Sequence, residues 1–98
     1  MKEYNKEKDP YWLFICEITD KVWAELSDEK REKLKTLGAF DSHFVFGASI
    51  RNKYIHNDER CKNWDADNLS GTIVGKLKRR ARGENEDVDP MELLMFTF

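Results

Sequence analysis

The sequence predicts an all-α protein, a compact single domain of four main helices with a short C-terminal helical element. Apolar residues recur at three- and four-residue steps in several stretches, as they do on one face of a helix. N-cap residues and glycines separate these stretches, at the points where helices begin and end. The chain has 98 residues, of which 40% are hydrophobic, so it can form one core but not two domains.

The first predicted helix begins at Asp9 and Pro10. Asp9 can accept hydrogen bonds from free backbone N–H groups, and proline suits the first helical position. Apolar residues follow at helical spacing as far as Leu26, so we expect this helix to be central to the core. Residues 1–8 are polar and aperiodic, which predicts a flexible N-terminus before a domain of residues 9–98. The expected apolar face consists of Tyr11, Trp12, Phe14, Ile15, Ile18, Thr19, Val22, Trp23 and Leu26.

A second helix is predicted over residues 28–37. Ser27 can cap it, and Gly38 fits the position that follows a helix end. Its only apolar residues are Leu34 and Leu37. The others are mostly charged, so we expect this helix on the surface.

The third predicted helix runs from residue 43 to residue 54 or 55, after an N-cap at Asp41 or Ser42. A strand over residues 44–46 is the competing prediction, because short apolar runs do not distinguish strands from helices. Residues 56–64 lack helical periodicity, so we expect a loop there. The expected stripe of the helix is Phe46, Ile50 and Tyr54, broadened by Phe44, Val45 and Ala48, and the loop's anchor is Trp64.

The fourth predicted helix lies between an N-cap at Asp65 or Asp67 and Gly83, which suits the position after a helix end. Leucine and isoleucine recur within it at four-residue steps. Gly71 and Gly75 are interpreted as small residues at which another helix crosses. The repeating apolar residues are Leu69, Ile73 and Leu77.

The chain ends in an apolar tail, residues 91–98. Asp89 and Pro90 repeat the start signal of the first helix, which predicts one or two helical turns over residues 91–96. Burying each large apolar side chain is worth about 1.5–3 kcal/mol, so such a tail does not stay in water. We expect it to pack against the first helix, either in the same chain or in a homodimer that forms through the tail.

Composition excludes several classes of protein. A formal net charge of −2 argues against a general nucleic-acid coat protein, which would be strongly basic. The longest apolar run, residues 11–16, is too short to span a membrane, and no secretory signal is evident. Two cysteines among many charges are typical of a reduced, cytoplasmic protein.

Two blocks of sequence stand out when they are taken together. Residues 46–54 are Phe-Gly-Ala-Ser-Ile-Arg-Asn-Lys-Tyr, and residues 67–74 are Asp-Asn-Leu-Ser-Gly-Thr-Ile-Val. The pair resembles a family of small bacterial and phage-borne domains of unknown function, which carries a Gly-x-x-Ile-Arg-Asn helix and then an Asp-Asp-x-Ser-Gly-x-Ile-Ile helix start. The chain departs from that pattern in a short loop and in Asn68, where the family has its second Asp. The resemblance covers residues 44–77 and implies a fold rather than a reaction.

The strongest candidate site combines Arg51, Asn52, Asp67 and Ser70. An arginine fork can grip a carboxylate or phosphate at two points, so these residues can form a polar pocket for an anionic ligand. The interpretation that we favour is structural. Arg51 would bond Asp67 or the carbonyls that end a neighbouring helix, while Asp67 caps the fourth helix through the Ser70 amide. Such a cluster would fix how two helices meet.

A second candidate is the basic end of the fourth helix. Between residues 50 and 83, nine Lys and Arg outnumber four Asp and Glu, whereas residues 84–98 hold five acids and no base. The cations can contact a nucleic-acid backbone. Alternatively, they face water at the negative end of the helix and are neutralised by the acidic segment. We favour this second interpretation and expect only weak, salt-sensitive binding to nucleic acid. The cluster consists of Lys76, Lys78, Arg79, Arg80 and Arg82.

No catalytic, cofactor or metal site is predicted. His56 and Cys61 share a loop, but a cysteine nucleophile also needs an orienting group and an oxyanion site, and neither is evident. Two histidines and two widely separated cysteines lack the paired spacing of zinc ligands. Cys16 is expected in the core, and His43 at the surface or its boundary.

These observations favour a small cytoplasmic protein-interaction module without enzyme activity. The resemblance adds the hypothesis of a phage or mobile-element protein that binds and inhibits a larger host protein. The alternative is a nucleic-acid-binding protein that uses the basic end of the fourth helix. A ligand-binding or hydrolytic domain centred on Arg51 and Asp67 is the third hypothesis.

Overall fold

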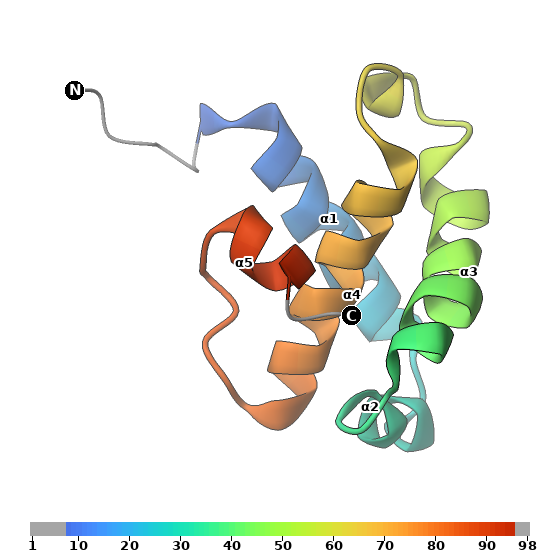
Figure 1. Ribbon diagram of the computed structural model, residues 1–98, viewed down its shortest axis with the longest axis vertical. Coiled ribbons are helices and arrows are strands. Elements are labelled where there is room, and N and C mark those ends of the chain that lie inside the picture. Colours follow the sequence, from blue (N-terminus) through green and yellow to red (C-terminus); the bar gives the residue numbers. More distant parts are fainter. Residues whose placement is uncertain (1–7, 96–98) are drawn as a thin grey trace.

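The computed structural model describes residues 8–95, which contain helices and turns but no strand (Figure 1). The predicted all-α class is confirmed, and the strand considered over residues 44–46 is wrong. The radius of gyration, 12.8 Å, is that of one compact domain of this length. The expected flexible N-terminus lies outside the described residues, except for Lys8. The elements are α1 (Pro10–Glu25), α2 (Asp28–Leu34), η2 (Asp41–Gly47), α3 (Ala48–Ile50), η3 (Arg51–Ile55), η4 (Glu59–Cys61), α4 (Ala66–Arg82) and α5 (Pro90–Met95).

α1 begins where the sequence predicts. The carboxylate of Asp9 accepts a hydrogen bond from the N–H of Tyr11 at 3.0 Å, and Pro10 is the first helical residue. The buried side of α1 includes most of the expected apolar face, but Leu13 on its other side is 50% exposed. α1 therefore covers the core from one side.

α2 begins as predicted but is shorter than expected. The hydroxyl of Ser27 accepts from the N–H of Lys30 at 3.2 Å and caps the helix. The helix ends at Leu34, and the chain continues in turns. Gly38 does not take the left-handed conformation expected after a helix end, so that prediction is wrong. Leu34 is the only buried residue of α2, as expected of a surface helix.

α4 is the most enclosed helix, while α1 lies in the core as expected and contributes five of its buried hydrophobic residues. All ten residues from Leu69 to Lys78 are buried. α4 contacts α1, α2, α5 and the helical stretch around α3, which together surround it (Figure 1). The small residues Ser70, Gly71 and Gly75 all lie within this buried stretch. A repeating pattern of large apolar residues does not identify such small residues as part of a packing surface.

Both ends of α4 follow the sequence signals. Asp65, rather than Asp67, is the cap, and its carboxylate accepts from the N–H of Asn68 at 3.0 Å. Gly83 ends the helix with a φ of 73°, in the left-handed region that glycine adopts without strain.

Residues 41–55 form one continuous helical stretch, which we call the third helix. It consists of two π-helical parts, η2 and η3, with α3 between them. In a π-helix each N–H bonds the carbonyl five residues earlier, as the N–H of His56 does to Arg51 at 2.9 Å. The predicted cap at Asp41 or Ser42 is wrong, because both residues lie inside the helix.

The wider π-helical turn changes which side chains of the third helix face the core. The predicted stripe of Phe46, Ile50 and Tyr54 assumes a four-residue step. In the structure Ile50 is buried and the next buried residue is Ile55, five positions later, while Phe46 and Tyr54 are only half-buried. Two flanking residues expected in the core therefore remain exposed.

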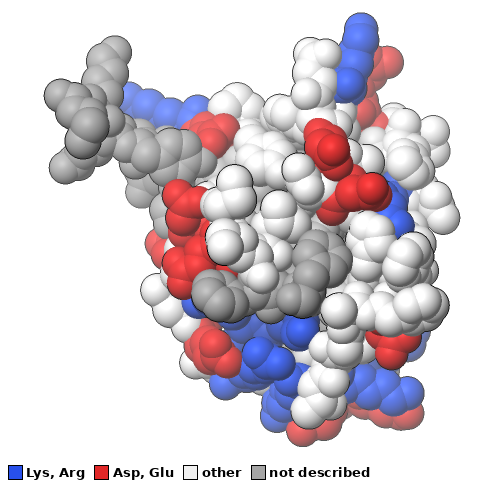
Figure 2. All heavy atoms as spheres, in the orientation of Figure 1, with Lys and Arg blue, Asp and Glu red and all other residues white. Residues whose placement is uncertain are grey.

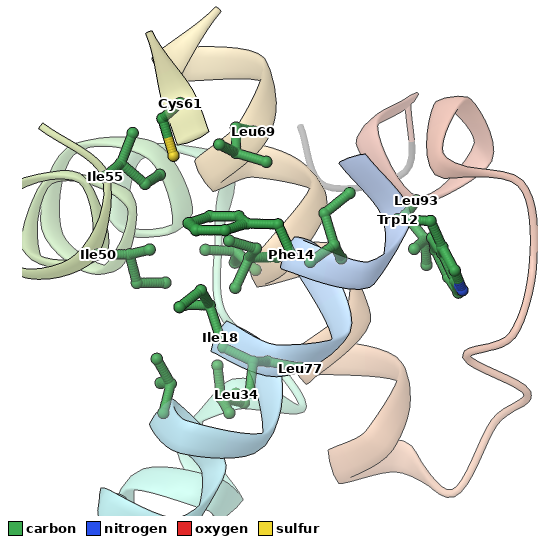
Figure 3. Packing of buried hydrophobic residues seen from close by; sticks show 14 residues of the cluster. Trp12, Phe14, Ile18, Leu34, Ile50, Ile55, Cys61, Leu69, Leu77 and Leu93 are labelled. Atoms are coloured by element: carbon green, nitrogen blue, oxygen red, sulfur yellow. The ribbon is translucent and has the colours of Figure 1, made fainter. Parts of the chain in front are cut away.

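The core lies between α1, α4 and the third helix (Figure 3). Phe14 of α1 extends toward Ile55 and Cys61 in this view. Trp64 anchors the loop before α4 as predicted, with its ring 5.2 Å from that of Tyr11 and 5.8 Å from that of Phe14. One turn of 3-10 helix, η4, interrupts this loop. The buried members are Trp12, Phe14, Ile15, Ile18, Val22, Leu34, Ile50, Ile55, Cys61, Leu69, Ile73, Val74, Leu77 and Leu93.

The tail docks in its own chain, mainly on α4. Asp89 starts α5 as predicted, and its carboxylate accepts from the N–H of Met91 at 2.8 Å. Leu93 is 1% exposed and belongs to the core. The prediction that the tail packs mainly against α1 is wrong, because the contacts of α5 are chiefly with α4. Residues 96–98 of the tail lie outside the described residues.

Candidate functional site

Three of the four predicted binding residues meet where the third helix crosses α4. The guanidinium of Arg51 donates to the hydroxyl of Ser70 at 2.9 Å and to the carbonyl of His43 at 3.3 Å. Its Nε lies 3.5 Å from the carboxylate of Asp67. The Ser70 hydroxyl donates to the Asp67 carbonyl at 3.1 Å. We call Arg51, His43, Asp67 and Ser70 the Arg51 cluster.

The Arg51 cluster is buried at its arginine and open at its acid. The side chain of Arg51 is 12% exposed and that of Asp67 is 66% exposed. Asn52, the fourth predicted residue, is exposed and takes no part in these bonds. Asp67 does not cap α4 through Ser70, so that part of the hypothesis is wrong. The donors of Arg51 point to acceptors of its own chain, which favours the structural interpretation over a ligand pocket.

Gly47 makes room for the Arg51 side chain. A Cβ atom at this buried position would lie 2.9 Å from the carbonyl oxygen of Ser42 and 3.0 Å from Nη1 of Arg51. Close-packed interiors leave no space for such an atom. In the sequence Gly47 stands out only as part of a motif, because the close approach to Ser42 and Arg51 depends on the fold.

Replacing Arg51 with alanine is expected to lower the free energy of unfolding by about 2 kcal/mol. The change removes the donors to two partly buried acceptors and leaves a cavity. The matched control is Asp67→Ala, expected to cost less than about 0.5 kcal/mol because its carboxylate faces water. Urea unfolding followed by circular dichroism measures both. An Arg51→Ala variant as stable as the parent would favour the ligand-pocket interpretation instead.

The basic end of α4 holds a second cluster, the α4 charge network of Lys76, Arg80, Glu86 and Asp20. Glu86 lies 2.9 Å from Nζ of Lys76 and 2.6 Å from Nη2 of Arg80. Arg80 also reaches Asp20 of α1 at 2.8 Å. The side chain of Lys76 is only 6% exposed. Glu86 thus holds two cations of α4, and it is half-buried.

The other cations of the predicted basic cluster also have acceptors in the same chain. Lys78 and Arg82 donate to backbone carbonyls just after α2, at 2.9 and 2.8 Å. Arg79 pairs with Glu92 of α5 at 3.1 Å. Burial lowers the pKa of Lys78, and the nearby charge of Arg82 lowers it further. The five cations therefore join α4 to its neighbours instead of forming a free basic surface.

Acid is expected to weaken the fold through Glu86. Hydrogen bonds from Arg80, and then from Lys76, hold the pKa of Glu86 below its usual value of 4.5. A group whose pKa is lower in the folded state stabilises that state above its unfolded pKa, and this stabilisation is lost as the pH falls through the folded pKa. The midpoint of urea unfolding should therefore fall more steeply below about pH 4.5 in the parent than in Glu86→Gln. Parallel curves for the two proteins would contradict this.

The cysteines and histidines do not form a reactive centre within residues 8–95. Burial raises the pKa of the Cys61 thiol and that of Cys16, which keeps both protonated and unreactive near neutral pH. Cys16 is half-buried against the core, and His56 is exposed. In the same part of the chain, no three His, Cys, Asp or Glu side chains are placed to hold a metal ion.

An exposed apolar surface lies at the start of the third helix, where the sequence predicts core residues. Phe40, Phe44 and Val45 are 69%, 59% and 55% exposed, and we call them the aromatic face. The rings of Phe40 and Phe44 are 4.9 Å apart. Figure 2 shows a mostly white surface over this helix, which carries few charged side chains in that view. The π-helical turn produces this face, because it rotates residues of the expected stripe away from the core.

Next to the aromatic face is an open groove of about 550 Å³, which we call the α2 groove. It lies between the C-terminal half of α1, α2 and the third helix. Its apolar lining includes Val22, Leu26 and Ile50. At its edge Glu25 accepts hydrogen bonds from Lys53 and Tyr54, both at 2.6 Å.

Comparison of the chain with protein-family models, with curated proteins and with solved structures found no match. Among residues 8–95, every helix is too short or too polar to cross a membrane. Surface geometry is therefore what distinguishes the functional hypotheses from one another.

Proposed function

We propose that this protein is a small interaction module that binds a larger protein through the aromatic face. The observation that carries the proposal is the exposure of three neighbouring apolar side chains, Phe40, Phe44 and Val45. Monomeric proteins rarely expose contiguous apolar patches, and such patches often mark protein-binding sites. Aromatic residues also contribute much of the binding energy at protein interfaces.

The other hypotheses rank lower on the same grounds. A nucleic-acid site at the end of α4 would need cations that are free to meet phosphates, and the cations there already have acceptors in their own chain. A small-ligand site at Arg51 would need a free guanidinium fork, but that fork already bonds Ser70 and His43. The proposal therefore includes no enzyme activity.

The cellular location and the genetic origin of the module are inferred from its sequence. We place it in the cytoplasm, where reduced thiols are the rule, and its two described cysteines are free. A phage or mobile element would encode it, and its target would be a larger host protein that it inhibits. The phage and inhibitor assignments rest on the resemblance, and they are separate from the binding surface.

The experiment that tests the proposal compares three tagged proteins in a lysate of the organism that carries the gene. These are the parent, Phe44→Asp, and the control Leu13→Asp, which introduces the same charge at a half-exposed leucine of α1. A photo-crosslinking residue at position 40 identifies the protein that contacts the face. The purified partner should then bind Phe44→Asp at least about tenfold more weakly than the parent, and Leu13→Asp normally.

Two results would overturn the proposal. One is a partner that binds all three proteins equally, since its contact would lie elsewhere. The other is submicromolar binding of DNA or RNA at physiological salt, which would favour the basic end of α4 instead.

A further inference from the structure

The aromatic face and the α2 groove lie side by side, and one projects where the other is hollow. The third helix contributes to both. Val45 belongs to the aromatic face and lines the groove. Phe44 is its neighbour in sequence and projects into solvent with Phe40. A single surface thus presents an apolar projection beside a hollow whose lining is part apolar and part charged.

The groove also carries one uncompensated charge of each sign. Lys30 and Asp41 both line it, and neither forms an ion pair within the part of the chain that the structure describes. Both residues are exposed. By contrast, Lys53 and Glu25 at the same groove pair with each other at 2.6 Å. The free charges are therefore one cation and one anion on a single face.

We infer that a second copy of this chain occupies the α2 groove in a two-fold symmetric dimer. Each copy places its Phe44 in the groove of the other, and each sets its Lys30 against Asp41 of the partner. A two-fold interface uses the same patch on both copies, so a residue and its contact appear twice. The inference rests on the proposed function, because both use the aromatic face as a protein-binding surface, and the second copy and the larger partner therefore compete for it.

Self-complementarity is what favours a second copy as the occupant of the α2 groove. Any other occupant of the groove would need a projection and two opposite charges in matching positions. This chain already presents all of them on one face, and two-fold symmetry brings each into register with its complement. The patch is small, so the dimer is expected to be weak, with a dissociation constant on the order of 10 to 100 µM.

Sedimentation equilibrium of the purified chain tests the inference, over concentrations from about 1 µM to about 1 mM. The parent should pass from monomer to dimer in this range. Phe44→Asp should weaken the dimer at least about tenfold, because it removes the ring that fills the groove and puts a hydrated carboxylate in its place. Leu13→Asp is the matched control and should leave the dissociation constant unchanged. Circular dichroism confirms that each variant is folded.

Charge exchange tests the two-fold pairing itself. Lys30→Glu and Asp41→Lys should each weaken self-association about threefold to tenfold, because each variant brings like charges together twice. An equimolar mixture of the two variants restores both ion pairs in the heterodimer. The mixture should therefore associate about as tightly as the parent. A mixture no tighter than either variant alone would overturn the pairing.

A chain that stays monomeric up to about 1 mM would overturn the inference but not the proposed function, which is decided by the partner's response to Phe44→Asp. A dimer that Phe44→Asp and Leu13→Asp weaken equally would also overturn it. Amide NMR spectra recorded at increasing concentration locate the contact. Shifts confined to α5 would assign the dimer to the tail and refute the groove.

Discussion

Replacing Glu86 with alanine is expected to lower the free energy of unfolding by about 3 kcal/mol, because it leaves a buried cation without its acid. Lys76 is the cation concerned, with a side chain only 6% exposed. Its ammonium stays near the Trp12 ring, 5.1 Å from the ring centre, but a ring replaces little of a lost carboxylate. Arg80 keeps its contact with Asp20 and loses less.

The control for Glu86→Ala is Glu84→Ala. Glu84 lies 3.9 Å from Arg82, and both side chains are well exposed, so its loss should cost less than about 0.5 kcal/mol. The double variant Lys76→Met with Glu86→Ala should recover much of the stability, because it removes the unpaired charge and keeps the volume. Urea unfolding measures all of these proteins. A cost below about 1 kcal/mol for Glu86→Ala would show that water reaches Lys76 and solvates it.

Gly47→Ala is expected to destabilise the fold by about 2 kcal/mol, although alanine normally stabilises a helix interior by about 0.5–1 kcal/mol relative to glycine. The new methyl group would meet the Ser42 carbonyl at 2.9 Å. That atom belongs to the backbone, so a turn of the third helix must shift. The Arg51 fork, 3.0 Å away, must move as well and would strain its bond to Ser70.

Gly38→Ala is the matched control for Gly47→Ala. Nothing lies within 4 Å of a Cβ atom at Gly38, and its φ is not positive. This variant should gain up to about 1 kcal/mol, because alanine restricts the unfolded chain. The two substitutions are chemically identical and should have opposite signs in thermal or urea unfolding. If both stabilise, the third helix has room that the structure does not show.

Helix ends were predictable where one side chain or one backbone conformation decides them. Asp9, Ser27 and Asp65 act as caps because each side-chain oxygen meets an N–H two or three residues later. Gly83 ends α4 because a left-handed residue is needed there. Gly38 shows the limit of the rule, since α2 ends before the glycine can act.

The apolar periodicity of the sequence could not predict which side of the third helix faces the core. A step of 3.6 residues predicts that Ile50 and Tyr54 share a face, and the π-helical turn puts Ile55 there instead. The choice between the two turns depends on contacts with α4, which no local pattern contains. For the same reason Phe44 and Val45 were expected in the core and are found on the surface, so the aromatic face was missed.

The sequence predicts most of the residues that meet at the candidate sites, but only part of what each residue does there. The positions of Arg51 and Asp67 at facing helix ends predict their contact, and the charge pattern indicates that the acidic segment meets the basic end of α4. That pattern does not indicate that Glu86 turns inward, because this depends on two cations, Lys76 and Arg80, that lie one turn apart on α4 and share one acid. Asn52 was grouped with Arg51 by its neighbourhood in sequence, yet adjacent helical residues point in different directions.

The central place of α4 has a consequence for how the protein opens. Neighbouring helices surround its middle turns, so the amide hydrogens there can exchange with deuterium only when the whole domain unfolds. α2 buries a single residue, and its amides can exchange through local fraying. The slowest amides of α4 therefore report global stability in native buffer without denaturant, while those of α2 register only the opening of one helix.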